Sequence, residues 1–181
     1  MKHIKSYKLF ESNSNLREVL IDIDDIIIDL EDQGFVKSKS ILFGYNWVNY
    51  ITEGDKILSN EPHRFGLTGE DLSDKEYRGI TIFFKSNKDN YDDIRSVFKR
   101  LVNYTDNNLK EFTKSNLGYC YGLSFNTMKT ISLDPNIFNF YKKRNIDEVF
   151  DELIIKGKSI QVPSYIKFNI YKPETRDTGP K

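Results

Sequence analysis

The sequence predicts an α+β fold, a two-layer domain in which two to three long amphipathic helices pack on a mixed or antiparallel sheet. Apolar residues recur at helical spacing in some segments of the chain and alternate at strand spacing in others. Several strand-like segments follow one another with no helix between them, which is not typical of a doubly wound parallel sheet. With 181 residues, the chain is long enough for one domain with a continuous core.

The first part of the chain predicts a helix, two strands and a long loop. The helix spans about residues 16–32 and ends before Gly34, and its apolar residues share one face at the helical period. Two runs rich in aliphatic and aromatic residues flank Gly44 and are typical of strands. Residues 53–77 are polar and interrupted by glycine and proline, so we expect a long loop there.

The middle of the chain predicts a central strand, a helix and a hairpin. Phe83 makes the strand over residues 78–86 apolar on both faces, so we place this strand centrally in the sheet. A second amphipathic helix is expected at about residues 89–104. The next strand, 117–125, alternates large residues with small ones, and small residues on one face would let a helix or a second layer approach closely. Residues 129–134 are its expected hairpin partner.

The last part predicts a third long helix and two strands. Asn145 and Glu148 have the spacing of a capping box, which marks the start of the helix, and Gly157 ends it. The final strands are expected at residues 159–162 and 165–171.

The two ends of the chain differ from its middle. Residues 1–13 predict a flexible arm, residues 14–171 a single domain, and residues 172–181, which contain no apolar residue, a loose tail. No apolar run is long enough to span a bilayer, so we expect no membrane-spanning helix. No apolar segment follows the N-terminal lysines, so we expect no secretory signal peptide, and the single Cys120 fits a reducing compartment.

The sequence contains no recognisable reaction motif. A phosphate-binding loop, a nucleophile elbow and a dinucleotide fingerprint are all missing. His3 and His63 each lack a second histidine nearby, and Cys120 lies in a predicted strand, where a cysteine usually packs as a small apolar residue. We therefore predict no catalytic residue, no cofactor and no metal site. An enzyme that combines His63 with carboxylates assembled only in the folded chain is an alternative.

The helix over residues 16–32 carries the most informative pattern. Five acidic residues, spaced four, three, four and three apart, form one stripe along it. They are Glu18, Asp22, Asp25, Asp29 and Asp32. Ile21 and Ile28 lie close to this stripe and away from the main apolar face, because each residue turns a helix by about 100°. The pattern fits either a solvated acidic face with both isoleucines covered, or an exposed apolar anchor beside a charged rim, which predicts a protein partner.

The predicted strand at 117–125 suggests an alternative function. Its first residues loosely resemble the first RNP motif of RNA-recognition domains, in which aromatic side chains stack on bases. Tyr119 and Tyr121 would supply the stacking faces, although Leu117 stands where a basic residue is expected. The nearest basic residues are Lys142, Lys143 and Arg144. Since 27 basic residues balance 27 acidic ones, and phosphate-backbone binding normally needs a basic excess, single-stranded nucleic acid is the alternative rather than the leading hypothesis.

Two short segments resemble proteins of tailed bacteriophages. The opening MKHIKSYKLFE, residues 1–11, resembles the N-terminal tag of many small phage proteins, and DDIIIDLEDQGFV, residues 24–36, is similar to a segment that recurs in uncharacterised phage proteins. The chain contains no alanine and many Asn, Ile and Lys residues, as AT-rich codons would produce. The resemblance implies a phage-encoded protein, in the virion or in the host cytoplasm. Our leading hypothesis is therefore a non-enzymatic accessory or structural protein that acts through protein contacts with a phage or host partner.

Overall fold

The computed structural model describes most of the predicted domain. The described residues are 16–43, 46–53, 56–59, 77–109, 114–122, 128–132, 145–157 and 159–172. The predicted arm and nearly all of the predicted tail lie outside this part of the chain, as do most of the predicted loop, both histidines and the basic residues at 142–144.

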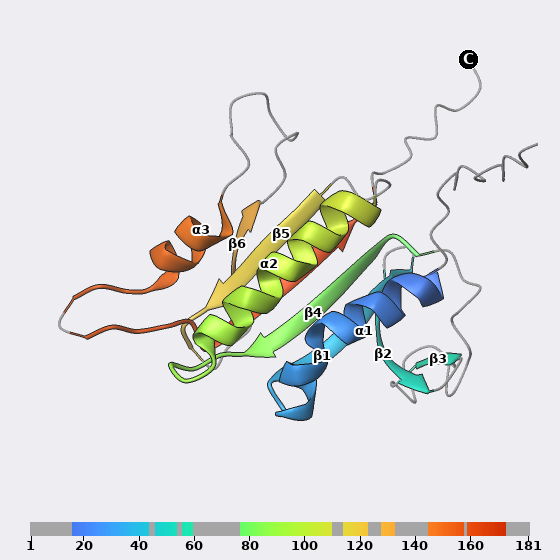
Figure 1. Cartoon of the computed structure of the whole chain (residues 1–181), viewed down its shortest axis with the longest axis horizontal. Helices are drawn as coiled ribbons and strands as arrows, with labels where there is room; N and C mark the ends of the chain where they lie inside the picture. The colour runs from blue at the N-terminus through green and yellow to red at the C-terminus, as the bar shows by residue number, and fades with distance from the viewer. Residues whose placement is uncertain are drawn as a thin grey trace, which may run out of the picture.

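The described strands form one antiparallel sheet of seven strands, in the order β3-β2-β1-β4-β7-β5-β6 (Figure 1). Their bounds are β1 Val36–Phe43, β2 Asn46–Glu53, β3 Lys56–Ser59, β4 Gly79–Lys85, β5 Lys114–Cys120, β6 Lys129–Ser132 and β7 Tyr165–Tyr171. The described helices are α1 Leu16–Asp32, α2 Tyr91–Asn108 and α3 Ile146–Leu153. The helices pack on the sheet, which confirms the predicted α+β class.

The helix α1 ends as its sequence predicts. Gly34 has a positive φ of 74°, a conformation that glycine adopts without steric cost. Its N–H donates to the Glu31 carbonyl at 2.9 Å, and the Phe35 N–H donates to the Leu30 carbonyl at 2.8 Å. These two bonds form a Schellman motif, which satisfies carbonyl groups that the end of a helix would leave unpaired.

The core lies between the helices and one face of the sheet. In Figure 1, α1 and α2 run side by side across this face, and α3 lies next to α2. Phe98 of α2 is at its centre, with its ring centroid 5.2 Å from Phe168 of β7 and 5.4 Å from Phe150 of α3. Both contacts are edge-on, the geometry that aromatic pairs prefer, so one ring joins a strand and two helices.

The strand β4 is central, as predicted. It is the fourth of seven strands, and Ile80, Ile82 and Phe84 point from it into the core. Phe83 points to the opposite face, where the Lys167 ammonium lies 5.4 Å from its ring centroid. The apolar Phe83 on the face away from the helices therefore correctly indicated a strand that has another strand on each side.

The opposite face of the sheet also carries specific contacts. Trp47 of β2 and Tyr171 of β7 meet edge-to-face across Gly79, with ring centroids 6.0 Å apart. A Cβ at Gly79 would stand 3.0 Å from the Tyr171 ring and 2.8 Å from the backbone of β7, so no larger residue fits. Beside them, the buried Thr81 hydroxyl donates to the Asn169 side-chain oxygen at 2.5 Å.

Two predicted boundaries in the first two thirds of the chain are wrong. Part of the predicted loop at 53–77 is the strand β3, which pairs with β2 at one edge of the sheet. Four residues are too few to show a strand period above a polar background. The second helix runs to Asn108 rather than Tyr104, because Thr105 is buried and its hydroxyl donates to the Leu101 carbonyl inside the helix.

The prediction of a third long helix is also wrong, because α3 has eight residues. After Leu153 the backbone becomes extended. Ile155 and Gln161 then form an antiparallel β-bridge, in which the N–H of each donates to the carbonyl of the other. Gly157 thus lies between two bridged segments rather than at a helix end, and the strand predicted at 159–162 contributes only this bridge.

The strand predicted at 117–125 is β5, which begins and ends earlier than expected. None of the described helices packs on its small-residue face (Figure 1). Instead, Gly118 makes room for side chains, since a Cβ there would stand 2.9 Å from the Lys167 stem and 3.1 Å from the Met128 sulfur. The small residues of this strand therefore correctly predicted that other groups approach its backbone closely. At Gly118, however, these groups are the side chains of Lys167 and Met128 and not a helix.

Candidate functional site

The two isoleucines that depart from the apolar face of α1 are exposed. Ile21 has 39% and Ile28 49% of its surface accessible, whereas the other aliphatic residues of this helix are buried or half-buried. They are one heptad apart, about 10 Å along the helix axis. Of the two interpretations of this pattern, the structure therefore shows the exposed one.

Four carboxylates lie beside this pair and face solvent. They are Glu18, Asp25, Asp29 and Asp32. None of the four forms an ion pair within the described part of the chain. The fifth member of the stripe, Asp22, accepts a hydrogen bond from the Tyr104 hydroxyl of α2 at 2.8 Å. Burial and this bond raise the pKa of Tyr104. Most of the stripe is thus exposed to solvent without a bonding partner on another described element, and one hydrogen bond, at Asp22, connects it to α2.

The two remaining acidic residues of α1 face β1, the third strand of the sheet, and hold a buried lysine. Lys39 of β1 is 8% exposed, and its ammonium donates to Asp24 and Glu31, with Nζ–O distances of 3.0 Å to each. Sequence analysis missed Lys39. The signal was its position two residues before Ile41 in an alternating strand, which places both side chains on the same, inward face.

Tyr50 of β2 completes this buried group. The Lys39 ammonium lies 5.3 Å from its ring centroid, within the range of a cation–π contact. The Tyr50 hydroxyl is buried and has no hydrogen-bond partner. Burial, followed by the nearby Asp24 and Glu31 carboxylates, raises its pKa well above the usual value. Lys39 and Tyr50 also line a hollow of about 260 Å³ at the point where β1 and β2 part.

A second hollow, of about 300 Å³, lies between α1 and α2 beside the acidic stripe. We call it the interhelical hollow. Its lining residues are Asp29, Leu30, Gln33, Asp93, Ser96, Val97 and Arg100. Leu30 and Val97 are buried and form its apolar floor, while Asp29, Asp93 and Arg100 are exposed at its rim. Sequence analysis missed the α2 residues, because the pairing of two helices is not visible in the pattern of either one.

Tyr119 and Tyr121 contact each other rather than standing free. Their rings meet edge-to-face, with centroids 5.9 Å apart, and both residues are half-buried. Tyr119 points to the helix side of the sheet, since its partner Ile166 does so, and the Tyr121 hydroxyl donates to the Leu153 carbonyl of α3. Lys142, Lys143 and Arg144 are outside the described residues, so nucleic-acid binding here stays a prediction.

Cys120 lies on the sheet face opposite the helices and is buried. Its thiol contacts the Gly122 carbonyl at 3.6 Å, and burial raises its pKa, which disfavours the reactive thiolate. His63 is outside the described residues, so the alternative of a site built from His63 and carboxylates also stays a prediction.

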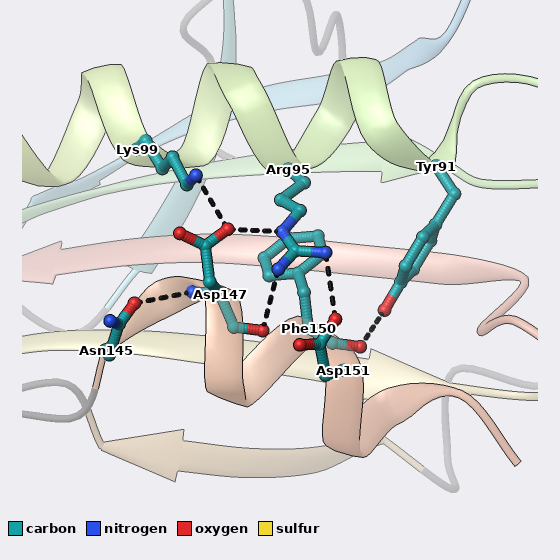
Figure 2. A network of polar contacts seen from close by, with 7 residues as sticks. All are labelled: Tyr91, Arg95, Lys99, Asn145, Asp147, Phe150 and Asp151. Carbon is teal, nitrogen blue, oxygen red and sulfur yellow. Dashed lines mark hydrogen bonds and ion pairs between the residues drawn. The ribbon is translucent and has the colours of Figure 1, made fainter.

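A polar network joins α2 to α3 on the side of the helix layer away from α1 (Figure 2). Arg95 donates from Nε to Asp147 at 2.6 Å and from Nη1 to Asp151 at 2.9 Å. Lys99 contacts the same Asp147 oxygen at 2.6 Å. The Asn145 side chain accepts from the Asp147 N–H and caps the helix. Since both cations are paired with carboxylates, the network holds α3 in place and offers no open charge.

Comparison of the chain with known protein families, with curated proteins and with solved structures gives no match. Within the described residues, no helix has the length and apolar character needed to cross a membrane. The same residues contain no group of three or more histidine, cysteine or acidic side chains that could hold a metal ion.

Proposed function

We propose that the protein binds a partner protein through the outer face of α1, which carries Ile21, Ile28 and the acidic stripe. It would act as a non-enzymatic accessory or structural protein of a tailed bacteriophage. One observation carries the proposal: Ile21 and Ile28 are exposed, one heptad apart, beside carboxylates that have no ion pair in the described structure. The phage origin is supported by the resemblance of two short segments and by the alanine-free composition.

The energetics of such a surface favour association. Complete burial of an isoleucine side chain contributes about 2 kcal/mol, and each of these is already partly covered, so the pair would contribute about 2 kcal/mol together. The surrounding carboxylates would add little affinity at the rim. They would instead speed the encounter with a basic partner and reject an acidic one. An apolar centre with a charged rim is the usual composition of a protein interface.

A double substitution tests this proposal. Ile21→Ser with Ile28→Ser removes both apolar side chains, and we expect the variant to lose the partner that the wild-type protein retains from a lysate of cells carrying its gene. Quantitative mass spectrometry of the retained proteins measures the loss. Because each side chain is already about half covered, we expect each substitution to lower the free energy of unfolding by about 1 kcal/mol, against roughly 2–5 kcal/mol for truncating a fully buried isoleucine.

The chain offers a matched control for that experiment. Ile155 and Ile160 are also exposed, at 43% and 60%, and belong to the segment that follows α3, which Figure 1 shows on the side of the helix layer away from α1. Changing both to serine removes the same apolar area and should leave the partner bound. A partner that is lost equally from both double variants, or from neither, would contradict the proposal, and so would a large drop in melting temperature for the α1 variant.

A further inference from the structure

We propose that the partner element is a basic amphipathic helix, which lies along α1 and places an arginine or lysine side chain in the interhelical hollow. This inference rests on the proposed function, since it names the chemistry of the partner at the same surface. Three features of the described residues carry it: the spacing of the isoleucines, the open charge of the stripe, and the shape of the hollow.

The spacing of Ile21 and Ile28 matches a helix. Two apolar residues one heptad apart on α1 can contact residues one heptad apart on a second helix, as in a coiled-coil seam. Asp25 and Asp32 follow each isoleucine by four residues, at the position where coiled coils carry the charges that select a partner. A helix with apolar residues at one-heptad spacing and basic residues beside them therefore complements this face.

The negative charge of the acidic stripe determines the sign of the charge that a partner must carry. Lys39 forms ion pairs only with the two carboxylates on the sheet side, Asp24 and Glu31. The carboxylates on the solvent side have no cation of their own within the described part of the chain. Bringing an acidic helix against them would place like charges close together, whereas a basic helix would supply the missing cations.

The interhelical hollow has the features of a receptacle for one basic side chain. Its volume of about 300 Å³ is at the lower end of the range for ligand pockets, which suits a single side chain better than a cofactor. Leu30 and Val97 form an apolar floor for the aliphatic stem of an arginine or lysine. At the rim, Asp29 and Asp93 outnumber the single Arg100, so the hollow favours a cation by one net charge.

The test uses a defined probe. A fluorescein-labelled helical peptide two heptads long, with two leucines one heptad apart and arginines on either side, is titrated with the full-length protein, and fluorescence anisotropy gives the dissociation constant. A second peptide has glutamine at every arginine position, and a third has glutamate. We expect the arginine peptide to bind at least about tenfold more tightly than the other two at low ionic strength, and to weaken as salt is added.

Variants of the hollow have predicted effects of opposite sign. Asp29→Asn with Asp93→Asn should weaken the arginine peptide about fivefold, since it removes two charge contacts. Arg100→Gln should strengthen it about twofold, because the competing cation is gone. Asp89→Asn with Glu148→Gln changes the net charge as much as the first pair, at exposed positions outside the hollow, and should leave the affinity unchanged.

The outcomes separate this inference from the proposed function. If all three peptides bind alike, if none binds, or if both pairs of acidic substitutions weaken binding equally, the partner chemistry inferred here is wrong. The proposed function would still stand if Ile21→Ser with Ile28→Ser abolishes capture of the cellular partner. If that variant also retains the partner, both proposals fail together.

Discussion

At the scale of single residues, Lys39 is the least expected feature of the structure. A lysine is almost never fully buried unless it is paired, and here two carboxylates of α1 and the ring of Tyr50 surround its ammonium. The ion pairs connect α1 to β1, at the side of the helix that faces away from α2. Lys39 thus fixes the rotation of α1 about its axis, and that rotation keeps Ile21 and Ile28 toward solvent.

Replacing Lys39 with methionine should destabilise the protein. The methionine fills similar space, but Asp24, whose side chain is 17% exposed, would keep its negative charge without the lysine. We expect the free energy of unfolding to fall by about 3 kcal/mol, as measured by urea denaturation followed by circular dichroism.

Two further variants check the cause. Adding Asp24→Asn to Lys39→Met removes the carboxylate that has lost its lysine and should restore part of the stability. Lys37→Met changes an exposed lysine of the same strand and should be nearly neutral. A Lys37 variant as unstable as the Lys39 variant would show that the ion pairs are not the cause.

At the scale of elements, α3 is a helix that depends on its neighbours. Eight residues are too few for a stable isolated helix in water. Its ends are held instead by the Asn145 cap, by Arg95, and by two tyrosine hydroxyls that donate to the carbonyls of Phe150 and Leu153. Apart from the Asn145 cap, these contacts come from α2 and from Tyr121, which directly follows β5, so we expect α3 to form only when both are in place.

The pairing of Asp147 predicts a dependence of stability on pH. Hydrogen bonds from Lys99, and then from Arg95, lower the pKa of Asp147 below its usual value. A carboxyl group with a lowered pKa in the folded state stabilises the protein above its unfolded-state pKa, and this stabilisation is lost as the pH falls through the folded-state pKa. Asp147→Asn should therefore be less stable than the wild-type protein at neutral pH, and the difference should shrink in acid.

Urea denaturation at neutral and acidic pH measures that difference. Glu148→Gln is the matched control, because Glu148 is also in the first turn of α3 and its loss has the same effect on the helix dipole. If both variants lose stability to the same extent at neutral pH, the effect belongs to the helix terminus and not to the contacts with Arg95 and Lys99.

The elements that the sequence predicted well are those whose pattern is long and whose ends carry a local signal. The helix α1 has a complete apolar face and a glycine at its end, and β7 alternates over its full length. The strand β3 has no such signal, and the end of α3 depends on a bridge between Ile155 and Gln161 that no local pattern shows. In the candidate site, the angle of Ile21 and Ile28 on the helix placed them beside the acidic stripe but left open whether they were covered, and the structure decides that they are exposed. Lys39, Asp93 and Arg100 became visible as part of the site only once the elements were packed.

At the scale of the whole molecule, the order of the strands differs strongly from their order in the chain. The last strand, β7, is inserted between β4 and β5, and it pairs with both along its full length. The core beneath β4 and β7 is therefore complete only when residues 80 to 92 positions apart in the sequence have met. Such distant pairings are slow to form, because the loop between them must close first.

Hydrogen exchange should reveal this arrangement. We expect the backbone amides of β4 and β7 to exchange most slowly, near the limit set by global unfolding, and those of β3 and α3 at least about tenfold faster. Nuclear magnetic resonance of the protein transferred into deuterated water measures the rates. Amides of α3 that exchange as slowly as those of β4 would contradict the view that α3 is a dependent element.

The contact between Trp47 and Tyr171 has a practical consequence. Trp47 is the only tryptophan of the chain, and it lies on the sheet face turned away from the helices. Its fluorescence is thus an intrinsic reporter on the far side of the molecule from α1. A ligand that docks on α1 alone should leave that emission unchanged, whereas a shift in wavelength on binding would mean that the sheet itself deforms.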